Sequence, residues 1–120
     1  MTDQIPDGLV WNEQLALEIV DGCISDLKDL LEIWLRQSPR LLSDIRSALE
    51  SHDAKKLHLA AHTLRGSLQI FCTDVDHSAA AALEAVGRIG QTPNEIDLFT
   101  KLEVEIALVT QQVVVFLKAN

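Results

Sequence analysis

Four polar residues in the middle of the chain share the spacing of one helix face. On an α-helix, which turns by about 100° per residue, His58, His62, Arg65 and Gln69 form a continuous polar stripe. An exposed imidazole is partly unprotonated near neutral pH, so it can act as a nucleophile or as a metal ligand. An arginine one turn further along the helix can pair with the oxygens of a phosphoryl group. The stripe is therefore the first candidate for chemistry, with His62 at its centre.

Gly66 lies beside this polar stripe and is the second unusual feature of the helix. A glycine inside a helix costs up to about 1 kcal/mol relative to alanine, so its presence needs a reason. A bare backbone beside His62 would let a large partner approach the imidazole. Leu59 and Ile70 lie near Gly66 and outside the main apolar stripe. They either pack under a neighbouring helix, which we favour because a bundle helix touches two neighbours, or form an apolar rim that receives a partner.

The opposite side of the same helix is apolar and is expected to face a core. Its apolar positions are Leu57, Ala60, Ala61, Leu64, Leu68, Phe71 and Cys72. Asp53 stands in the turn that precedes this segment and can cap the helix through its carboxylate. We therefore expect one helix that begins after Asp53 and extends to Cys72.

The N-terminal segment predicts a short helix behind a mostly irregular lead-in over residues 1–10. Asn12 can cap a helix that runs to about Val20, with Leu15 and Ile19 on its buried face. The apolar residues at the end of the lead-in are expected to fold back onto the core; they are Leu9, Val10 and Trp11.

A longer helix follows, and it carries the clearest periodic signal in the chain. Ser25 is its expected cap, and apolar residues spaced three and four apart continue as far as Leu49. Pro39 removes one backbone hydrogen bond from this helix. Because the apolar stripe stays in phase across the proline, we expect a kink rather than a break.

Two more helices are expected in the C-terminal part of the chain. Cap candidates at residues 73–76 precede a helix whose small alanines indicate close packing against its neighbours. Its inward positions are Ala79, Ala82, Leu83, Val86 and Ile89. Residues 92–95, TPNE, form a capping box with proline at the first helical position, which predicts the start of the last helix. The inward positions of that helix are Phe99, Leu102, Ile106, Val109, Val113 and Phe116.

These segments together predict an all-α fold. Four amphipathic helices joined by short turns form an antiparallel up-down four-helix bundle, with the short additional N-terminal helix covering one end. In such a bundle each apolar stripe has a partner face. The stripe around His62 is then the one polar surface whose residues the bundle does not explain.

Composition and charge restrict the classes of function. A chain of 120 residues, 48% of them hydrophobic, has enough apolar side chains for one core, so we expect residues 1–120 to be a single domain. The net charge of −8 argues against nucleic-acid binding, which needs clustered Lys and Arg. No apolar run approaches the roughly 20 residues of a membrane span, and the acidic N-terminus does not resemble a signal peptide. A cytoplasmic protein without membrane association is expected, with Cys23 and Cys72 as reduced core thiols.

One stretch of the sequence resembles a known family. The segment AHTLRGS, followed by Phe71, is similar to the His-x-Leu-Lys-Gly-Ser signature of histidine-containing phosphotransfer (HPt) domains. Residues 37–67 as a whole resemble the helix, turn and active-site helix of that family. Three positions depart from the family pattern, with Arg65 for the usual Lys, Ile70 for a common Asn and Cys72 for a common Gly. The first departure keeps the charge, and the other two affect helix packing.

The resemblance implies a phosphohistidine carrier in a multistep two-component phosphorelay, with His62 reversibly phosphorylated. Arg65 and Gln69 are the expected phosphoryl-stabilising residues. The partners would be response-regulator receiver domains and a sensor histidine kinase, or hybrid kinase, which dock on His58, Leu59, Gly66 and Ile70. The chain has no glycine-rich nucleotide loop and no evident carboxylate cluster for Mg²⁺. We therefore expect a monomeric carrier that is not itself an enzyme and needs no cofactor, while the receiver domain brings the Mg²⁺.

Two other classes of function use the same residues. His58 and His62 stand four residues apart, which suits a metal such as zinc. However, Leu59 replaces the glutamate of a zinc-protease helix, and no third ligand is evident. The second alternative is a helical interaction module that docks partners and performs no chemistry. The intact His62 argues against that alternative.

Overall fold

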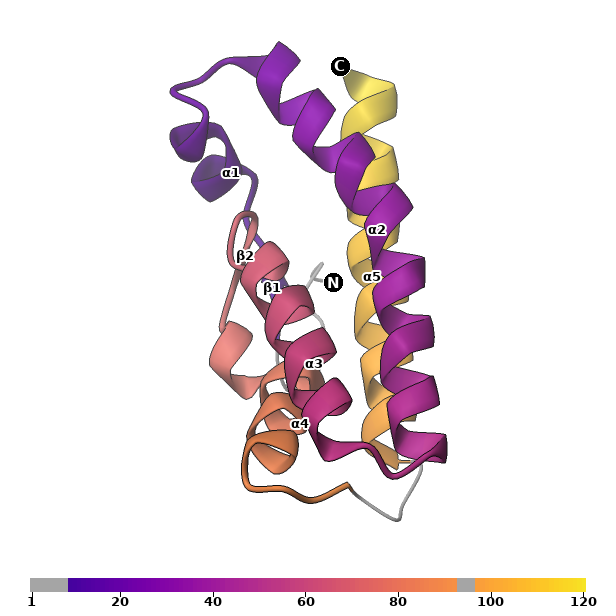
Figure 1. Ribbon diagram of the computed structural model, residues 1–120. Coiled ribbons are helices and arrows are strands. Elements are labelled where there is room, and N and C mark those ends of the chain that lie inside the picture. Colours follow the sequence, from indigo (N-terminus) through magenta and orange to yellow (C-terminus); the bar gives the residue numbers. More distant parts are fainter. Residues whose placement is uncertain (1–8, 93–96) are drawn as a thin grey trace.

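The computed structural model describes residues 9–92 and 97–120, and these residues are mostly helical (Figure 1). This confirms the all-α class expected from the periodicity. The elements within the described ranges are, in chain order, β1 (Val10–Trp11), α1 (Glu13–Ile19), α2 (Ile24–Glu50), α3 (Ala54–Leu68), β2 (Cys72–Thr73), the 3₁₀ helix η1 (Val75–His77), α4 (Ala79–Arg88) and α5 (Asp97–Ala119).

The two long helices α2 and α5 lie side by side along the length of the molecule (Figure 1). Helix α3 packs against α2 and α4, and α4 also packs against α5. Helix α1 contacts α2. The apolar faces of these elements meet in one hydrophobic cluster. No helix in the described part of the chain is long and apolar enough to cross a membrane.

Helix α1 begins as predicted but turns a different residue to the core. The side chain of Asn12 accepts a hydrogen bond from the backbone N–H of Leu15 at 2.9 Å, which confirms the predicted cap. The buried residue of this helix is Ala16, whereas Ile19 is 51% exposed. The prediction for Ile19 was therefore wrong. Ile19 is the last residue of this seven-residue helix, and the chain turns away directly after it, so its side chain stays uncovered.

Helix α2 starts earlier than predicted and crosses its proline without a break. Its N-cap is Cys23, which makes no side-chain capping bond, so the predicted cap Ser25 lies within the first turn. Cys23 is exposed, which contradicts its expected place in the core. The helix continues past Pro39, in agreement with the rejection of a break. Its fully or nearly buried apolar residues are Leu27, Leu31, Trp34, Ile45 and Ala48.

Helix α3 is shorter at its C-terminus than predicted because a small sheet follows it. The helix ends at Leu68, and Cys72 pairs with Trp11 in an antiparallel two-stranded sheet. The lead-in therefore folds back as expected, and Leu9 is buried. The ring of Phe71 packs against Trp11 with centroids 5.5 Å apart. The sheet was not predicted, because two-residue strands leave no periodic signal.

Helix α4 packs closely against α3, as its small residues predicted. Its cap is Ser78, whose Oγ accepts a hydrogen bond from the N–H of Ala81 at 3.2 Å. Residues 73–76, where the cap was expected, belong to the end of β2 and to η1 with its N-cap Asp74. A Cβ added to Gly87 would lie 2.7 Å from the backbone nitrogen of His58. Only a glycine fits this contact. Ile89, predicted to face inward, is 68% exposed because it follows the last helical residue.

Helix α5 follows the predicted register from its first described turn. All six predicted inward positions are buried. The valines at 113–115 lie within the helix, so the longer period prevails over their local strand preference. Most of the predicted capping box over residues 92–95 lies outside the described residues. From its inward face, Glu105 reaches α4, where its Oε1 accepts a hydrogen bond from the N–H of Ala79 at 2.9 Å.

Candidate functional site

His62 projects from the face of α3 that is turned away from the core. Asp53 caps this helix by accepting a hydrogen bond from the N–H of Lys56 at 3.0 Å, as predicted. Residues such as Leu57 and Leu64 anchor the opposite face and are fully buried. The side chain of His62 remains 63% exposed. The imidazole therefore stands on a rigid helix and is open to an incoming reactant.

A carboxylate from the neighbouring helix contacts the imidazole. Nδ1 of His62 lies 2.7 Å from Oε2 of Glu84 on α4, and the Glu84 side chain is only 5% exposed. Burial alone raises the pKa of Glu84, but hydrogen bonds from His62 and Arg65 outweigh it and hold that pKa below its ordinary value. Glu84 is therefore ionised at neutral pH and can only accept hydrogen bonds.

This contact decides which nitrogen of His62 is nucleophilic. Because an ionised carboxylate has no hydrogen to donate, Nδ1 carries the proton of the neutral ring. The lone pair then resides on Nε2. A neutral imidazole held in this way can attack an electrophile through Nε2 without first losing a proton.

Arg65, the cation one turn after His62, is bound by two carboxylates. Its Nη1 donates to Oε1 of Glu84 at 2.9 Å, and its Nη2 donates to Oδ1 of Asp76, in η1, at 3.0 Å. The hydrogen bonds to Asp76 and then to Glu84 raise the pKa of Arg65 above its ordinary value. In this structure the guanidinium therefore stabilises the buried end of Glu84. That pairing between helices was not part of the sequence prediction.

The structure places His58 beside His62 and puts Gln69 at the C-terminal end of α3. His58 is half-buried, and its Nδ1 lies 3.3 Å from the carbonyl oxygen of Glu84; its ring centroid is 6.0 Å from that of His62. Gln69 is the C-cap residue of α3 and lines a shallow hollow formed with residues 72–77. The polar stripe is thus continuous from His58 to Arg65, and Gln69 lies at its end beside η1.

The residues expected at the rim of the site differ in exposure. Leu59 is 54% exposed, so our preference for packing was wrong for this residue. Ile70 is partly buried against the core, which agrees with packing. Among the described residues, a Cβ added to Gly66 would meet nothing within 4 Å, so no contact in that part of the chain requires a glycine there.

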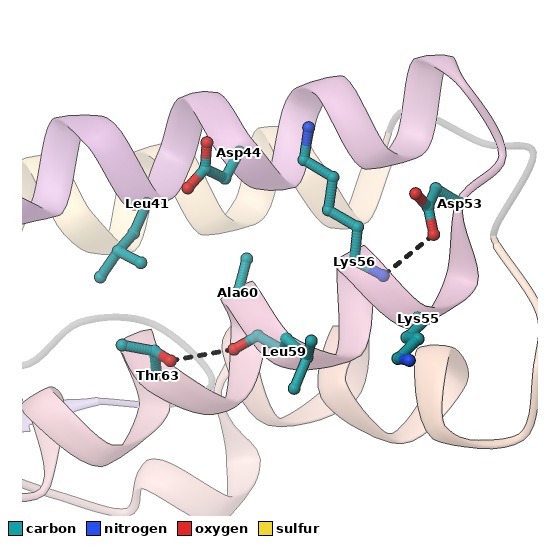
Figure 2. Close-up of a pocket in the computed structure, with 8 residues that line it drawn as sticks. All are labelled: Leu41, Asp44, Asp53, Lys55, Lys56, Leu59, Ala60 and Thr63. Atoms are coloured by element: carbon teal, nitrogen blue, oxygen red, sulfur yellow. Dashed lines mark hydrogen bonds between the residues drawn. The ribbon is translucent and has the colours of Figure 1, made fainter.

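A shallow groove of about 390 Å³ runs between α2 and α3. Figure 2 shows Leu41 on α2 and Ala60 on α3 pointing into this groove, with Leu59 and Thr63 at one side. Lys55, Lys56, Asp44 and Asp53 also line it. Thr63 follows His62 directly and Leu59 lies three residues before it, so the groove and the imidazole share the same stretch of α3.

Glu84 is a candidate site residue that the sequence did not predict, and it contacts both His62 and Arg65. It occurs four residues after Ala80 and three before Gly87, on the small-residue face that α4 turns towards α3. An acidic residue on a face of small residues was the signal that could have identified it. Within the described ranges, no group of three or more His, Cys, Asp and Glu side chains is arranged to hold a metal ion.

Comparison with known proteins adds two findings. A family model described as the Hpt domain matches residues 29–112, which is more than half of the chain. The crystal structure of histidine-containing phosphotransfer protein B (HptB) from Pseudomonas aeruginosa PAO1 superposes with a TM-score of 0.82, over 98% of this chain and 99% of that chain. Sequence identity in this pair is 19%, so the likeness concerns the fold. No curated protein sequence matches the chain at a significant level.

Proposed function

The chain belongs to the Hpt domain family and is a phosphohistidine carrier of phosphorelays, and we propose that His62 is the residue that carries the phosphoryl group. The observation that carries this proposal is the 2.7 Å contact between Nδ1 of His62 and Oε2 of Glu84. It holds an exposed imidazole in the tautomer whose lone pair is on Nε2. We therefore assign the phosphoryl group to Nε2.

The role of this chain in the transfer is to present the nucleophile. Hpt domains exchange phosphoryl groups with receiver domains and kinases of two-component systems. Phosphoryl transfer depends mainly on positioning and charge neutralisation. We propose that this chain has no ATP or metal site of its own, and that the receiver domain supplies Mg²⁺ along with its aspartyl phosphate. We propose that Arg65 and Gln69 stabilise the phosphoryl group. Arg65 would do so after it has released one of the two carboxylates that bind it.

The docking surface is proposed to surround His62 on α3. Leu59 supplies exposed apolar area, and Gly66 leaves the backbone open to close approach. His58 and Ile70 complete this surface, and the groove between α2 and α3 extends it beyond Leu59 (Figure 2). A receiver domain seated there would contact helix surface on both sides of the imidazole.

The packing of the helices supports the architecture expected from the sequence. Because α2 and α4 each pack against both α3 and α5, we infer an antiparallel up-down four-helix bundle, with α1 covering one end. We further propose that residues 1–120 form one domain and that the protein is a monomer. Its two cysteines are free thiols, which suits a cytoplasmic location.

The proposal is tested by incubating the protein with a phosphorylated receiver domain and Mg²⁺. The wild type should acquire acid-labile, base-stable phosphate. His62→Gln should acquire none, whereas His52→Gln, which changes an exposed histidine in the turn before α3, should be labelled like the wild type. Label on His62→Gln would refute the assignment. Absence of label on the wild type with several receivers would favour an interaction module without chemistry.

A further inference from the structure

Glu84 is a buried carboxylate for which both oxygens are occupied. Oε2 contacts Nδ1 of His62, and Oε1 accepts from Nη1 of Arg65. Burying an ionised carboxylate is costly unless it is paired and hydrogen-bonded. An apolar residue at this position would pack between α3 and α4 without that cost. The bundle alone therefore does not explain a glutamate at this position.

We propose that Glu84 is a positioning residue that keeps the proton on Nδ1 of His62 throughout phosphoryl transfer, and thereby keeps the phosphohistidine transferable. This inference rests on the proposed function of His62. It extends that function by giving the buried carboxylate a role in both directions of the reaction.

The forward step places positive charge beside Glu84. The Nε2 lone pair of His62 attacks the phosphorus of a receiver aspartyl phosphate. The bond between phosphorus and the aspartyl oxygen breaks, and its electron pair returns to the receiver carboxylate. The imidazole becomes a cation that still carries hydrogen on Nδ1. The carboxylate 2.7 Å from Nδ1 stabilises this cation by a charge-assisted hydrogen bond.

The reverse step depends on the same proton. When the carboxylate of a receiver aspartate attacks the phosphorus, the bond to Nε2 breaks and its electron pair returns to the ring. A ring that carries hydrogen on Nδ1 leaves as a neutral imidazole. A ring that has lost this proton would have to leave as an anion, which is a much poorer leaving group. Glu84 therefore favours the form of the phosphohistidine that reacts.

The groups around Glu84 keep it in the accepting state. Arg65 binds its second oxygen and is itself held by Asp76 of η1. His58, the other titratable group nearby on α3, contacts the backbone carbonyl of Glu84 rather than its carboxylate. Because Arg65 stabilises the charged carboxylate, the proton remains on Nδ1 instead of moving to Glu84.

Glu84→Gln provides the kinetic test, because it keeps the shape and an acceptor oxygen but removes the charge. Each protein is first phosphorylated, and transfer from its phosphohistidine to an unphosphorylated receiver domain is then timed with Mg²⁺. At saturating receiver the variant should transfer at least about tenfold more slowly, the scale expected for loss of a hydrogen bond to a charged group. The receiver concentration at half-saturation should not change. Glu103→Gln, on exposed surface of α5, is the matched control and should transfer like the wild type.

A transfer rate for Glu84→Gln equal to that of the wild type would overturn the proposal, although the variant would still show that His62 is phosphorylated. Lack of any phosphorylation in the wild type would instead refute the proposed function. If Glu84→Gln does not fold, the position of the proton on His62 in the wild-type protein still tests the proposal. Its ¹⁵N-histidine NMR spectrum should show His62, in its neutral form, with hydrogen on Nδ1. Hydrogen predominantly on Nε2, as in free histidine, would contradict the proposal.

Discussion

Nδ1 of His62 and Oε2 of Glu84 lie 2.7 Å apart, which joins an exposed nucleophile on α3 to a buried carboxylate on α4. The contact depends on how closely the two helices approach. Gly87 sets that approach one turn after Glu84, because its bare backbone lies against the backbone of His58. The chemistry of the site and the packing of α3 on α4 are therefore coupled.

Replacing Gly87 by alanine should damage both stability and activity. The new Cβ would lie 2.7 Å from the backbone nitrogen of His58, so α4 has to move away from α3 and take Glu84 with it. Overpacking of this kind costs about 1–3 kcal/mol of unfolding free energy, measurable by urea denaturation. Gly66→Ala is the matched control, because its Cβ meets nothing; it should leave stability unchanged or raise it by up to about 1 kcal/mol. Equal losses in the two variants would contradict the close packing at Gly87.

Removing the Arg65 side-chain charge should destabilise the protein more than removing its exposed partner. Arg65→Met leaves the buried Glu84 carboxylate with one hydrogen bond fewer, at an expected cost of about 1–3 kcal/mol in unfolding free energy. Asp76 is exposed, so Asp76→Asn should cost less than about 1 kcal/mol. Urea denaturation of both variants at pH 7 measures the difference. A larger loss in Asp76→Asn would show that the outer ion pair is the more important one.

Glu105 should make stability depend on pH in a predictable direction. Burial raises its pKa in the folded state, and the hydrogen bond from Ala79 and the charge of Lys101 only partly offset this effect. A carboxyl group whose pKa is higher folded than unfolded binds its proton more tightly in the folded state, so its contribution to stability increases as pH falls through the folded pKa. Glu105→Gln keeps an acceptor for the N–H of Ala79 and removes the charge. The variant should be more stable than the wild type at pH 7, and the difference should shrink as the pH is lowered to about 4.

Leu59 should matter for docking and not for folding. Because its side chain is largely exposed, Leu59→Ser should change the unfolding free energy by less than about 0.5 kcal/mol. The receiver concentration that half-saturates phosphoryl transfer should rise several-fold, since apolar contact area is lost. Val115→Ser, a similarly exposed apolar residue on α5, should leave that concentration unchanged. Equal effects of the two substitutions would move the docking surface away from α3.

The helix caps and the buried faces of α3 and α5 could be predicted from the sequence. Asn12 and Asp53 cap their helices as predicted, because a cap depends on residues within one turn of it. The exposure of His62 followed from the 3.6-residue period of α3, whose apolar stripe had to face the core. The inward register of α5 was predictable for the same reason.

The contacts between helices and strands could not be predicted from the sequence pattern. Glu84 meets His62 because two helices approach closely, and periodicity does not specify the distance between helices. Cys72 leaves the predicted helix because it pairs with Trp11, a residue far away in the sequence. Ile89 lies at a helix end, where one turn of difference in length decides whether a side chain is covered.

The most direct test of the central claim is to locate the phosphoryl group by ³¹P and ¹⁵N NMR on histidine-labelled protein phosphorylated by a receiver domain. The Glu84 contact predicts a single phosphohistidine, at His62, with the bond to phosphorus on Nε2 and a hydrogen retained on Nδ1. A bond to Nδ1 of His62, or a phosphoryl group on any other residue, would contradict this account.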